Sequence, residues 1–125
     1  MGPTNQGTAF TLTAHVVHAA AMAVAEMASA PVGADQVVAG SPDVHVRSLY
    51  EGADLGIGIW QHSPGTSTDV EADEVFVVLS GQATVHIDGA PALHVGPGDV
   101  AFLPAGARTT WTVHETLRKV YIVRP

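Results

Sequence analysis

The chain has 125 residues, a length that suits one domain built around one core. Its formal net charge of −7 argues against a nucleic-acid partner, because a phosphate backbone needs a basic footprint, and against an anionic membrane surface. The absence of cysteine excludes disulfides and thiolate metal sites, whereas 46% apolar residues are enough to fill a core.

Residues 1–37 are interpreted as a lead-in that is partly helical. Ala, Met and Glu favour a helix over 14–29, and Pro31-Val32-Gly33 ends it. The stretch Ala28-Ser29-Ala30 is similar to a signal-peptidase site, but no Lys or Arg precedes Arg47, so the positive segment of a signal peptide is missing. We therefore expect a helical or coiled segment and a cytoplasmic protein.

From residue 38 to residue 125 the pattern predicts one barrel. Short runs rich in Val, Ile, Thr, Phe and Trp alternate with turns rich in Gly, Pro and Asp. Many short strands without intervening helices predict an all-β antiparallel sandwich or barrel. The expected strands are 44–50, 55–61, 74–79, 83–87, 92–95, 100–103, 109–114 and 117–123. A turn is expected at Ser80-Gly81, and a hairpin with Asp88-Gly89 at its tip.

Two segments resemble the two motifs of the cupin superfamily. Glu74-Val-Phe-Val-Val-Leu-Ser-Gly81 matches the E-x6-G end of the first motif, and Gly98-Asp-Val-Ala-Phe-Leu-Pro104-Ala-Gly106 matches the front half of the second. The resemblance implies a jelly-roll barrel. Further segments, from Gly58 to Gly65, Asp73-Glu74 and from Trp111 to Tyr121, resemble the ureidoglycine-aminohydrolase-like short bacterial cupins, which are related to the ethanolamine-utilisation protein Q cupin.

The metal-binding positions that the resemblance implies are mostly filled by other residues. Cupins commonly hold Fe, Mn, Ni or Zn through three His and one Glu. Here the first two His positions fall on Thr68 and Val70, or on Ser67 and Asp69, and the third falls on Thr109; only Glu74 remains. We expect no metal and no other cofactor, with an atypical set of His62, Asp69, Asp73 and Glu74 as the alternative.

Strand alternation predicts which side chains face the barrel interior. If Glu74 points inward, as the resemblance implies, Phe76 points inward too. If Thr109 points inward, so does Trp111. The same alternation predicts that Trp60, Lys119 and Tyr121 face the interior. The predicted catalytic residues are Glu74, Lys119 and Tyr121. The predicted ligand-binding residues are Trp60, His62, Thr68, Phe76, Thr109 and Trp111, with Lys119 or His62 near the rim.

Each of these residues also has a purely structural explanation. Either Trp could fill the core, Glu74 could form an ion pair with Lys119 or Arg118, and both cations could be surface charges. The acidic run Asp69, Glu71, Asp73 is expected to be a solvated loop. His86, His94 and His114 are expected to face solvent.

Three functions remain open from the sequence. The first is a metal-independent pocket for a small organic molecule, in which Glu74 acts as acid or base in a lyase, isomerase or cyclase-type step, or only binds. The second is a metalloenzyme with atypical ligands, such as a dioxygenase or an aminohydrolase. The third is a non-enzymatic accessory protein. We expect a homodimer, since pairing of small barrels covers exposed edges.

Overall fold

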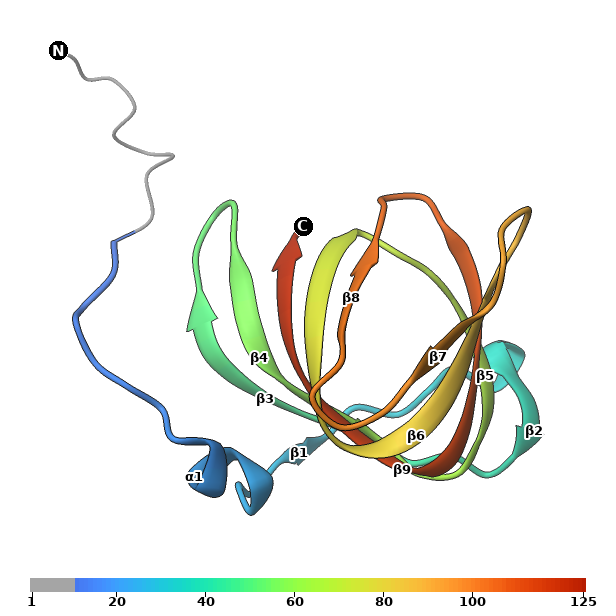
Figure 1. The fold of residues 1–125 in the computed structure, drawn as a ribbon, viewed down its shortest axis with the longest axis horizontal. Coiled ribbons are helices and arrows are strands. Elements are labelled where there is room, and N and C mark those ends of the chain that lie inside the picture. Colours follow the sequence, from blue (N-terminus) through green and yellow to red (C-terminus); the bar gives the residue numbers. More distant parts are fainter. Residues whose placement is uncertain (1–10) are drawn as a thin grey trace, which may run out of the picture.

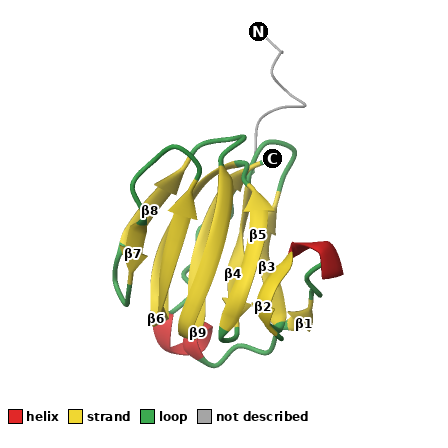
Figure 2. Ribbon diagram, turned by 90° about the vertical axis from the view of Figure 1, so that its right-hand side faces the viewer, coloured by secondary structure: helices red, strands yellow, loops and turns green. Residues whose placement is uncertain are grey.

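The computed structural model describes residues 11–125, which form a curled antiparallel sheet with a short helical segment before it (Figures 1 and 2). The expected all-β jelly-roll barrel is confirmed. The elements are α1 Ala19–Ala23, β1 Ala28–Ser29, the 3-10 turn Ala34–Gln36 (η2), β2 Val37–Gly40, β3 Val44–Glu51, β4 Gly56–His62, β5 Gly65–Val70, β6 Asp73–Ile87, β7 Leu93–Val95, β8 Val100–Leu103 and β9 Arg108–Arg124. Within the described residues no helix is long and apolar enough to cross a membrane.

Two long strands, β6 and β9, organise the sheet. They pair with each other along most of their length, and each changes its second partner halfway. The first half of β9 pairs with β5 and the second half with β4, while β6 pairs first with β8 and then with β7. The sheet therefore curls into a barrel whose strands run from β1 and β3 on one side to β5 and β2 on the other.

The expected break at Ser80-Gly81 is wrong, because β6 continues through it. The register between β6 and β9 shifts around Ser80 and Gln82, and Gly81 has a φ of 95°, which L side chains rarely adopt. An irregularity of this kind bends a strand without ending it. The expected break between 114 and 117 is absent for the same reason, since β9 runs unbroken to Arg124.

The helix expected over 14–29 is also too long. Only Ala19–Ala23 is helical, and the following Ala28–Ser29 pairs with β3 instead. Three strands escaped the sequence pattern: β1, β2 and β5. The first two are short, and β5 reads Gly-Thr-Ser-Thr-Asp-Val, which lacks the apolar alternation that marks a strand.

The core fills the interior of the barrel. Phe76, Val78, Val85, Trp111 and Leu117 are buried there, and Trp60 and Tyr121 pack against them. In β9 the inward residues alternate from Thr109 through Trp111 and Val113, and from Leu117 through Lys119 to Tyr121. His86, His94 and His114 are exposed, as the sequence predicts; His94 and His114 both contact the Thr84 hydroxyl.

Candidate functional site

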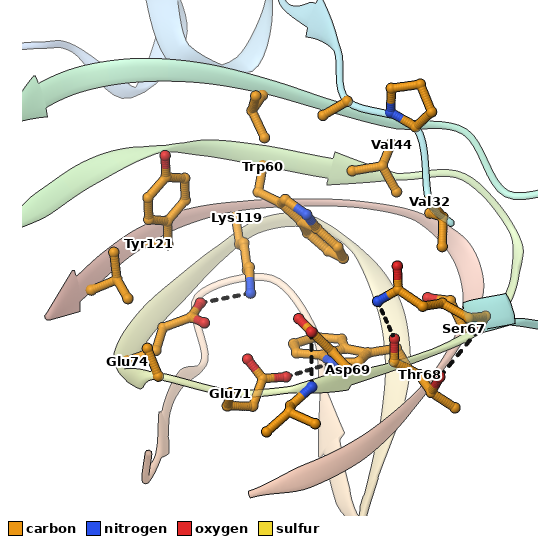
Figure 3. A pocket seen from close by; sticks show the side chains of 18 residues that line it. Val32, Val44, Trp60, Ser67, Thr68, Asp69, Glu71, Glu74, Lys119 and Tyr121 are labelled. Atoms are coloured by element: carbon orange, nitrogen blue, oxygen red, sulfur yellow. Dashed lines mark hydrogen bonds and ion pairs between the residues drawn. The ribbon is translucent and has the colours of Figure 1, made fainter. Parts of the chain in front are cut away.

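A cavity of about 410 Å³ lies at one end of the barrel interior (Figure 3). Strands β4, β5, β6 and β9 form its inner walls, and the segment from Ala30 to Gln36 forms an outer wall together with β3. The lead-in thus contributes residues 30–36 to the site, and none of these was among the predicted site residues. Gln36 ties this segment to β5 because its Nε2 donates to the backbone oxygen of Thr68 at 3.1 Å. Six predicted site residues line the cavity: Trp60, Thr68, Glu74, Trp111, Lys119 and Tyr121.

The central feature of the cavity is an ion pair between Lys119 and Glu74. The Lys119 Nζ donates to Glu74 Oε2 at 2.7 Å, and the two side chains are only 5% and 10% exposed. Glu74 opens β6 and Lys119 lies on β9, and the register of these strands brings both to the inner face. Lys119 is therefore neither a surface nor a rim cation, and it is the ion-pair partner that the sequence allowed for Glu74.

The Lys119 ammonium also lies among aromatic rings. Its Nζ is 4.5 Å from the Trp60 ring centroid, 4.3 Å from that of Phe76 and 4.4 Å from that of Trp111. Each ring is close enough for a cation–π interaction, which offsets part of the hydration that the ammonium loses. Trp60 and Trp111 are tilted against each other at 5.4 Å, so both serve as core and as cavity wall.

Two carboxyl groups of the cavity, those of Glu74 and Asp69, are harder to ionise than in water. Burial raises the pKa of Glu74; the Lys119 charge and hydrogen bond oppose this shift, and the negative charges of Glu71 and Asp69 reinforce it. Burial, with the neighbouring Glu71 charge, also raises the pKa of Asp69. The pKa of the Tyr121 hydroxyl is raised by burial and by the charges of Glu51 and Glu74. A raised pKa is the direction that suits a carboxyl group acting as a general acid or base.

Glu71 is the main functional residue that the sequence analysis missed. It was expected in a solvated acidic loop, yet it is only 8% exposed and lines the cavity. Its Oε2 accepts hydrogen bonds from Thr109 Oγ1 at 2.6 Å and from Trp111 Nε1 at 3.1 Å. The clue in the sequence was the inward Trp111, whose indole N–H needs an acceptor when buried. Asp73, by contrast, is on the surface and pairs with Arg124.

His62, Phe76 and Thr109 do not line this cavity. His62 was expected near the rim but is 0% exposed, behind Trp60, with ring centroids 5.3 Å apart. Phe76 lies in the core against Trp111. Thr109 is buried and is connected to the cavity through its hydrogen bonds to Glu71 and to the indole of Trp111. Their contribution to the site is to hold the residues that do line it.

The strand register decides which of the two alternative residue pairs occupies the His positions of the first motif on the inner face. Ser67 pairs with Trp111 and Asp69 with Thr109, so Ser67 and Asp69 share the inner face with these two residues. Thr68 borders the cavity, but its hydroxyl donates to the backbone oxygen of Gln36 at 3.4 Å. The inward pair of the first motif is therefore Ser67 and Asp69.

A family model for the EutQ-like cupin domain matches residues 52–121. The chain belongs to this family. The match covers the region from the end of β3 to Tyr121 on β9, and so contains most of the inner wall of the cavity. A comparison with curated proteins finds no significant match to the sequence of this EutQ-like cupin.

Solved structures share the fold of this EutQ-like cupin. The EutQ protein of Clostridium difficile is 22% identical with a TM-score of 0.62, over 77% of this chain and 81% of that one. A Rhizobium leguminosarum protein of unknown function is 28% identical with a TM-score of 0.60, over 66% of this chain and 81% of that one. A Pseudomonas syringae protein of unknown function is 24% identical with a TM-score of 0.72, over 80% of this chain and 45% of that one.

The donor set of the cavity does not fit the metal centre that many cupins carry. Among residues 11–125 no group of three or more His, Asp or Glu side chains is placed to hold a metal ion. The Glu at the usual ligand position, Glu74, already binds the Lys119 ammonium. Ser67, Asp69 and Thr109 stand where imidazoles would be needed, and a hydroxyl is a poor substitute for an imidazole towards first-row metals.

Proposed function

We propose that this EutQ-like cupin binds a small organic molecule in the cavity without a metal ion, and that Glu74 transfers a proton to or from it. The observation that carries the proposal is the buried Glu74–Lys119 pair inside an aromatic-walled cavity. A cavity of about 410 Å³ is in the range of small-molecule sites, which combine apolar walls with a few placed polar groups.

The chemistry that fits this arrangement is a lyase, isomerase or cyclase-type step. Glu74 as carboxylate would accept a proton from the ligand and hold it as a carboxylic acid, in a surrounding that already favours the neutral form. Lys119 would stay an ammonium and stabilise negative charge that develops on the ligand nearby. Tyr121, which lines the same wall, would supply a hydroxyl for orientation.

The test is a fragment screen followed by NMR, with the indole N–H signals of Trp60 and Trp111 as reporters of the cavity. Neutral, cationic and anionic fragments are screened against the wild type, Glu74→Gln and the control Glu115→Gln on the exposed face of β9. We expect fragments that shift both indole signals and that bind differently to Glu74→Gln but not to the control. Ligand responses identical in all three proteins would support a non-enzymatic accessory role. Stoichiometric metal whose removal abolishes fragment binding would support the atypical metalloenzyme.

We also propose that the chain forms a homodimer through the outer face of β8, β6 and β9. Phe102 is 68% exposed, Val100 is exposed on the same strand, and Ile122 is exposed on the far side of β6, where Val75 pairs with both Phe102 and Ile122; a second copy would cover this apolar patch. Phe102→Glu is expected to convert a dimer to a monomer in size-exclusion chromatography with light scattering. A monomeric wild type would contradict this.

A further inference from the structure

The hydrogen bonds around His62 determine which way the Ser67 hydroxyl points its proton. His62 Nδ1 lies 2.6 Å from the backbone oxygen of Ser63, and a carbonyl only accepts, so Nδ1 carries the proton. Burial lowers the pKa of His62, and the positive charge of Lys119 lowers it further, against the opposing effect of the Ser63 hydrogen bond, so the ring is neutral. Its Nε2 therefore accepts the proton of Ser67 Oγ at 2.9 Å.

This chain of hydrogen bonds makes Ser67 an acceptor towards the cavity. Ser67 lies on the inner face of β5 and lines the cavity, and its only O–H points away from it, to His62. The oxygen lone pairs remain for a ligand. A buried histidine that does not itself reach the cavity thus determines what kind of group can bind there.

The neighbours of Ser67 on the same wall are acceptors as well. Asp69 follows on the same face of β5, and its Oδ1 holds only the N–H of Val70 at 2.8 Å. Glu71 comes next and lines the cavity with Asp69. The one ammonium of the cavity, Lys119, donates its hydrogen bond to Glu74, although its charge also reaches Asp69, and Trp60 faces Asp69 and Glu71 across the cavity (Figure 3).

We propose that the ligand is a small organic cation with several N–H donors, such as a primary ammonium, amidinium or guanidinium compound. Its cationic end would donate to Ser67, Asp69 and Glu71, and its apolar part would lie against Trp60. This proposal rests on the cavity being a ligand site, as proposed above. Three carboxylates and one ammonium line the cavity, so a cation also balances its charge, whereas an anion would meet repulsion and no free donor on this wall.

The test uses three planar probes of nearly the same shape: benzamidinium, benzamide and benzoate, which differ in charge and in donors. Binding is measured by calorimetry, and the indole signals of Trp60 and Trp111 report whether a probe enters the cavity. We expect benzamidinium to bind at least about tenfold more tightly than benzamide, since hydrogen bonds to charged groups contribute more than neutral ones. Benzoate is expected not to bind.

Two variants test whether the wall that contains Ser67 and Asp69, and not the rest of the cavity, binds the cation. Asp69→Asn and Ser67→Ala are expected to weaken benzamidinium binding about fivefold or more and to leave benzamide within about twofold. Asp54→Asn and Ser80→Ala, the same changes at exposed positions, serve as matched controls. Asp69→Asn keeps the acceptor for the Val70 N–H, so this variant stays informative if Ser67→Ala lowers stability.

The outcomes distinguish this proposal from the one on which it depends. If benzoate binds and shifts the indole signals as strongly as benzamidinium, the cation proposal is wrong and the cavity is still a ligand site. Equal binding of benzamidinium to wild type and Asp69→Asn would also overturn it. If no probe shifts the indole signals while fragments from the screen do, the cavity accepts another class of ligand and the cation proposal is again wrong.

Discussion

Lys119 donates to Glu74 at 2.7 Å inside the barrel, although the two residues are 45 positions apart in the chain. The pair depends on the register between β6 and β9, in which Phe76 faces Tyr121 and Val78 faces Lys119. Fold and chemistry are therefore coupled here: the same strand pairing that forms the barrel brings the carboxylate to the ammonium. Removing either partner leaves an uncompensated charge in the interior.

Removing one partner of this ion pair is expected to destabilise the folded protein strongly, whereas replacing both partners by apolar residues is expected to destabilise it much less. Lys119→Met and Glu74→Leu should each lower the free energy of unfolding by about 3–5 kcal/mol, since the remaining charge stays buried and unpaired. The double variant should recover much of that loss, because an apolar pair of similar volume needs no hydration. Urea denaturation of all four proteins gives the coupling energy.

The exposed pair of Asp73 and Arg124 is the natural control. Their atoms are 3.4 Å apart at the surface, so Arg124→Met should change the free energy of unfolding by less than about 1 kcal/mol. Single variants of the buried pair that cost no more than this control would show that the interior is hydrated.

Glu71 is expected to stabilise the site through its acceptor oxygen and not through its charge. Glu71→Gln retains an oxygen for the Trp111 indole and the Thr109 hydroxyl and should change stability little. Glu71→Leu leaves the buried indole N–H with only the Thr109 hydroxyl at 3.2 Å, and takes from that hydroxyl its acceptor at 2.6 Å, and should cost about 1–3 kcal/mol. Thermal and urea denaturation, with Glu115→Leu on the exposed face of β9 as control, measure the difference. Equal losses for Glu71→Gln and Glu71→Leu would show that the charge is what stabilises the site.

Much of the barrel was predictable because its strands have clear patterns. Val100–Leu103 is alternately exposed and buried as a strand on a barrel surface should be, and its bounds were predicted correctly. The continuity of β6 was not predictable, since Ser80-Gly81 is typical of a turn and only the partner strand shows that the chain goes on. β5 was missed because its inward positions are Ser67 and Asp69, and polar inward residues hide a strand from any search for apolar alternation.

The site residues on strands were predictable from the alternation of inward and outward side chains, whereas those in loops were not. Trp60, Lys119 and Trp111 follow from the period of their strands once one inward residue is known. Glu71 lies between β5 and β6, where no period exists, and its position depends on backbone hydrogen bonds with the 105–107 turn. The wall formed by Ala30–Gln36 comes from a segment without a repeating pattern, and only its contacts with β5 show where it lies.

Gly81 is expected to tolerate no side chain. A Cβ at this position would clash with the backbone oxygen of Thr116, in addition to the strain of a φ of 95°. Gly81→Ala should cost clearly more than the roughly 1–3 kcal/mol of strain alone, because β6 and β9 would have to separate. Gly89→Ala in the β6–β7 hairpin is the control, since its φ is also positive but the space around it is open. Equal losses in denaturation would mean that backbone strain, and not the close approach of β9, is what requires glycine at 81.

Arg118 is expected to hold the helical segment against the barrel. Its Nη1 donates to the backbone oxygen of Met22 at 2.7 Å, and its Nε donates to Gln61 Oε1 at 2.9 Å. Arg118→Met should increase hydrogen exchange in residues 19–27 while leaving β6 and β9 protected, since few other contacts retain this segment. Arg108→Met, at the exposed start of β9, is the control. Unchanged exchange in 19–27 would show that the remaining contacts, among them the hydrogen bond from Arg47 Nη1 to the backbone oxygen of Glu26 at 3.0 Å, are enough to dock the segment.

His62 is expected to make the protein less stable as the pH falls below neutral. Its pKa is lowered in the folded protein by burial, from an ordinary value of 6.5, so between 6.5 and the lowered value the unfolded chain takes up a proton that the folded protein does not. The unfolded state therefore gains stability as the pH falls through this window, and the free energy of unfolding decreases. His62→Gln, which can still donate to Ser63 and accept from Ser67, should remove this part of the slope.

The raised pKa values of Glu74 and Asp69 change the free energy of unfolding with pH in the opposite direction. Wild type and variant share this contribution, so the difference between their two slopes isolates His62. Urea denaturation at intervals between about pH 7.5 and pH 5 measures it. A variant whose stability falls as steeply as that of the wild type would show that His62 already takes up its proton in the folded state, and Ser67 would then face the cavity as a donor.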